Sequence, residues 1–169
     1  LVLLNQRKSW DELHRELELV EPSAILTDGD DYGCNEEMQA AYGSLLRPMD
    51  AYKAYEPAEL VNRIQPEELM VLMFTSGTTG RSKGVMLSQK NLFTAMPAFL
   101  TPFEDVRSQT GWNTDAFSSL SCLPMFHISA MTSLVSWSIT GHCVNLCNDL
   151  KYFYRDLGAM RSDVMAVVP

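Results

Sequence analysis

The residues best suited to chemistry lie in one ten-residue segment, Thr75–Gly84, which reads Thr-Ser-Gly-Thr-Thr-Gly-Arg-Ser-Lys-Gly. Its three glycines allow a tight turn and close approach to a ligand, and consecutive N–H groups in such a turn form an anion-binding nest. Four hydroxyls ahead of Arg81 add donors for phosphate oxygens, and Lys83 adds a mobile positive charge. The residues predicted to hold phosphate are Thr75, Ser76, Gly77, Thr78, Thr79, Gly80, Lys83 and Gly84.

The apolar run Leu69–Phe74 leads directly into this segment and predicts a buried strand that ends at the loop. An ordinary solvated loop is the alternative, because Gly, Ser and Thr are common in loops. Ten such residues directly behind a buried strand favour a cradle for a polyphosphate. The G-x-x-x-x-G-K-[ST] motif does not fit, because Ser82 stands where its second glycine belongs. The chain also has no G-x-G-x-x-G for a dinucleotide.

The segment Thr75–Val85 closely resembles the signature of the adenylate-forming enzymes, which include acyl-CoA synthetases, luciferases and peptide-synthetase adenylation domains. The family pattern is Thr-Ser-Gly-Thr-Thr-Gly-x-Pro-Lys-Gly-Val, and the chain departs from it only at Ser82, where proline is usual. The continuation Met86–Leu92 is also similar, with Gln89 where the family commonly has His. Because proline fixes φ, Ser82 leaves the loop less stiff, but we expect phosphate binding to persist.

A second segment, Leu123–His127, follows the next expected strand. The acyl-CoA synthetases have a similar Leu-Pro-x-Phe-His segment, whose His lies by the acyl pocket near the substrate carboxylate. The resemblance implies that His127 and Phe126 border the substrate pocket, where an imidazole can donate to a carboxylate or form a flat wall. Taken alone, a His after Phe is more often a packed or capping residue.

The resemblance implies a two-step reaction. A small-molecule carboxylic acid attacks the α-phosphate of ATP, which gives an acyl-adenylate and pyrophosphate, and the thiol of coenzyme A then takes the acyl group. Mg²⁺ would bridge phosphate oxygens, and the family's catalytic lysine and Mg²⁺-binding glutamate belong to later segments, so no catalytic residue is assigned here. We expect an apolar, fatty acid, because the uncharged stretch Ala116–Asn148 would border the acyl pocket. Met125, Met131 and Trp137 would suit an apolar chain, although such residues at helical spacing are more often core.

Two alternatives stay open at this point. One is a peptide-synthetase adenylation domain, which loads an amino acid onto a carrier-protein thiol. The other is a non-catalytic module that kept the phosphate loop and lost the chemistry.

Composition narrows the partners. The 169 residues are 46% hydrophobic and 20% charged, which is enough apolar material for a core. The net charge of −8 argues against nucleic acid or an anionic membrane. The four scattered cysteines indicate reduced thiols in a cytoplasmic protein rather than a disulfide scaffold or a zinc site. Pro124, Gly141 and two histidines interrupt Ala116–Asn148, which argues against a transmembrane segment.

Strand and helix signals alternate along the chain and predict an α/β fold, a mostly parallel sheet with helices on both faces. Both motifs then lie beyond the carboxyl ends of strands, where such sheets bind ligands. A capping box of Ser9 and Glu12 starts the first helix, in which Glu16 is expected to face water. The expected strands are Leu1–Leu4, Ala24–Thr27, Leu69–Phe74, Ala116–Leu123, Cys143–Leu146 and Val164–Val168.

The remaining expected helices are Glu36–Leu46, a helix capped by Ser88 that ends near Leu100, Ile128–Ile139, closed by Gly141, and Tyr152–Met160. The segments Arg47–Glu68 and Thr101–Asp115 are interpreted as surface connections. We expect residues 1–169 to be one α/β piece of the N-terminal domain of an adenylate-forming enzyme, cut at both ends. Exposed strand edges would then favour self-association.

Overall fold

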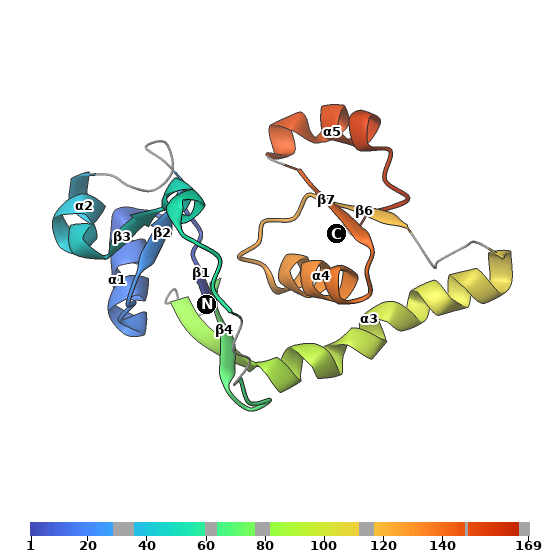
Figure 1. The fold of residues 1–169 in the computed structure, drawn as a ribbon, viewed down its shortest axis with the longest axis horizontal. Coiled ribbons are helices and arrows are strands. Elements are labelled where there is room, and N and C mark those ends of the chain that lie inside the picture. Colours follow the sequence, from blue (N-terminus) through green and yellow to red (C-terminus); the bar gives the residue numbers. More distant parts are fainter. Residues whose placement is uncertain (29–35, 60–63, 77–81, 112–116, 148, 166–169) are drawn as a thin grey trace. The chain divides into compact units, whose positions relative to one another are not determined.

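The computed structural model describes residues 1–28, 36–59, 64–76, 82–111, 117–147 and 149–165 (Figure 1). Strands and helices alternate, which confirms the predicted α/β class. The helices are α1 (Trp10–Val20), α2 (Glu36–Tyr42), α3 (Gln89–Thr110), α4 (Ile128–Ile139) and α5 (Phe153–Met160), with 3₁₀ turns η1 (Gly43–Leu45), η2 (Met49–Ala54) and η3 (Leu150–Tyr152). The strands are β1 (Val2–Leu3), β2 (Ile25–Thr27), β3 (Leu46–Pro48), β4 (Leu69–Ser76), β5 (Ser82–Ser88), β6 (Ser118–Ser121), β7 (Cys143–Leu146) and β8 (Val164–Met165).

The described strands form three small sheets, in the orders β1-β4-β5, β2-β3 and β7-β6-β8. The pairs β1/β4, β2/β3, β6/β7 and β6/β8 are parallel, as the alternating pattern predicts. The neighbours β4 and β5 differ, because β4 ends at Ser76 and β5 begins at Ser82. A parallel crossover needs about a dozen residues, so this short connection makes an antiparallel hairpin. The sheet that carries the predicted phosphate loop is therefore mixed.

The chain divides into two compact units, which are described separately. Unit 1 comprises Leu1–Leu3, Gln65–Met73 and Val85–Pro169, and unit 2 comprises Leu4–Ile64 and Phe74–Gly84. The predicted phosphate loop therefore belongs to unit 2, and His127 belongs to unit 1.

In unit 1, the central strand β6 lies between β7 and β8. Leu120 of β6 is 1% exposed, and Ser119 and Ser121 beside it are also buried, as expected for a parallel strand covered on both faces. Helix α4 connects β6 to β7, and α5 connects β7 back past β6 to β8. Because parallel crossovers are right-handed, these opposite directions place α4 and α5 on opposite faces of this sheet (Figure 1). The carboxyl end of β6 leads into the segment that contains His127.

A second core in unit 1 surrounds the strand that leads to the loop. Val71 and Met73 of β4 pack with Leu92 of α3 and Met131 of α4. Val71 is completely buried, so the strand is held firmly up to the residues just before the loop.

Helix α3 is longer than predicted. It begins as expected after Ser88, whose hydroxyl accepts from the N–H of Asn91 at 3.2 Å. It then runs through two prolines to Thr110, so the predicted loop over Thr101–Asp115 is wrong through Thr110. Phe103, in the unexpected half, packs on Trp137, with ring centroids 4.8 Å apart. This tertiary contact favours helix where the local sequence does not.

In unit 2, α1 starts with the predicted capping box. Both the N–H and the hydroxyl of Ser9 donate to Glu12 Oε2, at 3.1 and 2.9 Å. Leu13 and Leu17 bury the inner face of the helix. The expected helix Glu36–Leu46 ends at Tyr42, and Leu46 instead begins β3, which pairs with β2 and extends into Arg47–Glu68, predicted as a plain connection. That segment also contains the turn η2.

Candidate functional site

The hairpin of β4 and β5 brings the two ends of the predicted phosphate loop together. Thr75 Oγ1 lies 3.5 Å from the carbonyl oxygen of Lys83, a long contact between facing strands. The side chains of Thr75 and Lys83 are exposed, so a hydroxyl and an ammonium are both accessible to an anion. Gly84 follows on the exposed part of β5. The other predicted ligands, Gly77, Thr78, Thr79 and Gly80, and the side chain of Ser76, lie outside the described residues.

Lys8, which the sequence alone did not single out, lies beside both strands that flank this loop. Lys8 Nζ donates to Ser82 Oγ at 3.1 Å. The same nitrogen lies 5.9 Å from the centroid of the Phe74 ring, next to Thr75. It also forms an ion pair with Glu16 Oε1.

Glu16 corrects one expectation. It was predicted to face water, but it is only 1% exposed, on the inner side of α1. The sequence gave no signal of this burial, because Glu16 is close in sequence to acidic residues that were expected to face water. Lys8, the partner of Glu16, lies before the helix. Lys8 in turn binds Ser82, which is 74 positions away in the sequence. Such a long-range contact leaves no local periodicity to detect.

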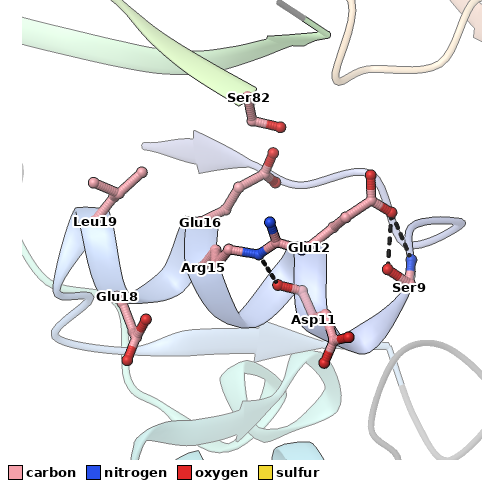
Figure 2. A pocket seen from close by; sticks show the side chains of 8 residues that line it. All are labelled: Ser9, Asp11, Glu12, Arg15, Glu16, Glu18, Leu19 and Ser82. Atoms are coloured by element: carbon pink, nitrogen blue, oxygen red, sulfur yellow. Dashed lines mark hydrogen bonds between the residues drawn. The ribbon is translucent and has the colours of Figure 1, made fainter. Parts of the chain in front are cut away.

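A cavity of about 700 Å³ lies between Ser82 and α1 (Figure 2). Its charged lining has four carboxylates against one guanidinium, so it repels a polyphosphate. The Arg15 Nε–H already donates to the carbonyl oxygen of Asp11 at 2.8 Å. The lining residues are Ser9, Asp11, Glu12, Arg15, Glu16, Glu18, Leu19 and Ser82.

The second predicted site begins at the carboxyl end of β6. His127 is the N-cap residue of α4, with an exposed side chain that makes no capping hydrogen bond. Its ring leans on Phe126, with centroids 4.7 Å apart. His127 thus has a fixed backbone and an accessible imidazole at the edge where parallel sheets bind ligands.

Two other residues suggested for an apolar chain belong to the core. Met131 is 8% exposed and Trp137 is 3% exposed, and both are buried within unit 1. His142, at the start of the segment that leads into β7, stacks on Phe117 with ring centroids 3.9 Å apart.

The Cys147 thiol lies in surroundings that disfavour its thiolate form. Cys122, Cys143 and Cys147 are free thiols, and Cys34 lies outside the described residues. Burial, and then the Asp156 carboxylate 3.3 Å away, raise the pKa of the Cys147 thiol. A raised pKa disfavours the nucleophilic form.

The described ranges contain neither a membrane-spanning helix nor a cluster of metal-ligating side chains. No helix there combines the length and the apolar character that crossing a membrane requires. No three His, Cys, Asp or Glu side chains there are grouped so that they could hold a metal ion.

Comparison with known proteins decides the family. The family described as AMP-binding enzyme matches residues 1–169. The chain belongs to this family. This confirms the resemblance to the adenylate-forming enzymes that the segment Thr75–Val85 indicated.

Its relatives include CoA ligases. The chain is 31% identical over 134 residues to 2-succinylbenzoate–CoA ligase from Bacillus cereus. This match covers 79% of the chain and 25% of that protein. It is 33% identical over 105 residues to long-chain-fatty-acid–CoA ligase 5 from Rattus norvegicus, which covers 62% of the chain and 15% of that protein. The chain therefore matches a quarter or less of the length of these relatives.

A solved structure shares the fold. O-succinylbenzoate coenzyme A synthetase from Bacillus subtilis, in complex with ATP and magnesium ion, superposes with a TM-score of 0.73 at 22% identity. The match covers 97% of this chain and 42% of that one. At this identity the likeness speaks for the fold alone.

Proposed function

We propose that this chain supplies the phosphate-binding part of an ATP-dependent acid–thiol ligase. The full-length protein would join a carboxylic acid to coenzyme A through an acyl-adenylate. The observation that carries the proposal is the segment Thr75–Gly84, which matches the family signature and has its ends held together across an antiparallel hairpin. The two relatives described above are named as CoA ligases, which supports the same reaction.

The residues of the loop would act by position and charge. Hydroxyls of Thr75, Ser76, Thr78 and Thr79, and backbone N–H groups of Gly77, Gly80 and Gly84, would hold the β- and γ-phosphates as they become pyrophosphate. Lys83, exposed on β5, would offset their charge. Mg²⁺, when bound with ATP, neutralises phosphate oxygens further. A synthetase of the same fold was solved with ATP and magnesium ion, and these are the ligands proposed here.

His127 and Phe126 would border the acid. An imidazole without a capping bond can donate to the substrate carboxylate, and the Phe126 ring beside it offers an apolar wall. The fatty-acid–CoA ligase among the relatives supports the predicted fatty acid. A second candidate acid is 2-succinylbenzoate, because the ligase named for it matches more of the chain. The cytoplasmic location expected from the cysteines remains a prediction.

The test is ATP–pyrophosphate exchange by the full-length protein, supplied in turn with fatty acids of graded length, 2-succinylbenzoate and a panel of amino acids. We expect exchange that depends on a fatty acid or on 2-succinylbenzoate. Exchange with amino acids alone would favour the peptide-synthetase alternative. Absence of exchange with every acid would favour a phosphate-binding module without catalysis.

A further inference from the structure

Lys8 touches the predicted phosphate loop on both sides of its base. Its ammonium donates to Ser82, which precedes Lys83 at the start of β5, at 3.1 Å. It also lies 5.9 Å from the ring centroid of Phe74, the residue before Thr75. An ammonium has three donors and no acceptor, so it can bind a hydroxyl, a carboxylate and an aromatic face together.

The position of Lys8 is itself fixed by a buried carboxylate. Glu16 is 1% exposed and its Oε1 pairs with Lys8 Nζ, whereas its Oε2 is buried without a hydrogen-bond partner in the described part of the chain. A buried carboxylate is strongly unfavourable without its cation, so Lys8 cannot swing away from this pair at low cost. Helix α1, which carries Glu16, is in turn held by its capping box and by buried Leu13 and Leu17.

We propose that Lys8 is a positioning residue for the phosphate loop, and that it acts through its hydrogen bond to Ser82. Proline, usual at this position, stiffens the backbone by fixing φ. Serine lacks that restraint but offers a hydroxyl, which Lys8 binds. The tether from Glu16 through Lys8 to Ser82 thus restores in this chain the stiffness that proline gives elsewhere. This inference rests on the proposed function of the loop.

Lys8 does not act as a direct phosphate ligand. Its charge is neutralised by Glu16, which also lines the acidic cavity beside Ser82. Lys8 therefore acts on nucleotide binding through the ordering of the loop.

The experiment compares three replacements of one residue in the full-length protein: S82A, which removes the hydroxyl, S82T, which keeps it, and S82P, which restores the usual stiffness. Each is made in the wild type and in a K8M/E16L background. That background removes both members of the buried pair, because K8M alone would leave a buried carboxylate and endanger folding. The readouts are KM for ATP in pyrophosphate exchange, inhibition by pyrophosphate, and melting temperature.

In the wild-type background, S82A should raise KM for ATP about tenfold, as expected for the loss of one charge-assisted hydrogen bond that is partly exposed. S82T and S82P should stay near the wild type. In the K8M/E16L background, KM should already be raised, S82A should add nothing, and S82P should restore it. A general loss of structure would lower the melting temperature of all variants together and would not spare S82P.

If S82A raised KM for ATP equally in the two backgrounds, the tether would be overturned, even if ATP–pyrophosphate exchange itself is normal. Absence of ATP–pyrophosphate exchange in the wild type would instead overturn the proposed function. In that case, amide hydrogen exchange of Thr75, Lys83 and Gly84 decides the tether separately. S82A must accelerate amide hydrogen exchange at these residues when Lys8 is present and must not do so in the K8M/E16L background.

Discussion

Replacing Lys8 by methionine should lower the free energy of unfolding by about 3 kcal/mol. The structure shows why the effect is large: Glu16 is 1% exposed, and its Oε2 has no hydrogen-bond partner among the described residues. Removal of the cation leaves a buried carboxylate, which costs about 3–5 kcal/mol in buried pairs. We take the lower end because the Lys8 side chain is 16% exposed, so water can partly reach the site.

The assay is urea unfolding followed by circular dichroism. With a dependence on urea of about 2 kcal/mol per molar, the loss corresponds to a midpoint lower by about 1.5 M. The matched control is Lys90→Met. Lys90 lies 3.5 Å from Glu67, but their side chains are 65% and 72% exposed, so this surface pair contributes little. The variant K8M/E16L should recover most of the stability, because no charge is then buried.

Two results would refute this reasoning. If K8M were no less stable than the Lys90→Met control, the carboxylate of Glu16 would have to be solvated in solution. If K8M/E16L were as unstable as K8M, the loss would come from packing rather than from the buried charge.

Three further predictions concern the loop, the substrate pocket and the first helix. Lys83→Ala should slow pyrophosphate exchange by the full-length protein about ten- to a hundredfold, with little change in melting temperature, because Lys83 is exposed. His127→Ala should raise KM for the acid about tenfold and leave KM for ATP unchanged, as steady-state kinetics with each substrate varied will show. Hydrogen bonds from the Ser9 side chain, and then from its backbone, lower the pKa of the Glu12 carboxyl. A lowered pKa stabilises the folded chain at pH values above the ordinary pKa of glutamate, and this stability is lost as pH falls through the pKa of the folded state. Ser9→Ala should therefore lower the free energy of unfolding at neutral pH. It should also reduce the loss of stability on acidification, as urea unfolding at a series of pH values will show.

Local signals predicted the elements on which the site depends. The apolar run before Thr75 gave β4, the capping box gave the start of α1, and Gly141, with φ of 80°, ends α4 in the left-handed conformation that glycine tolerates. In each case the cause lies within a few neighbouring residues. A single sequence contains that information completely.

Strand β5 could not be predicted in the same way. Ser82, Lys83 and Gly84 look like loop residues, and Gly84 disfavours a strand. They are extended because β4 supplies hydrogen-bond partners across the hairpin. The pairing is a property of two segments together.

The sequence did not predict the Lys8 tether or the second half of α3, for a related reason. Glu16 is buried because Lys8 neutralises it, and Pro102 is tolerated in a helix whose Phe103 packs on Phe117 and Trp137. Both depend on contacts between residues far apart in the sequence. The candidate phosphate site could be proposed from the sequence because its residues are contiguous. Lys8, which we propose to position it, could not, because it is distant in the sequence.

Phosphate binding by the loop is tested most directly by an NMR titration of the 169-residue chain with magnesium pyrophosphate, following backbone amide shifts. We expect the largest shifts within Thr75–Gly84, and their loss in Lys83→Ala, even if binding is weak. Shifts that leave this segment unchanged, or that gather instead around the acidic cavity of α1, would contradict the claim that the loop holds the phosphates of ATP.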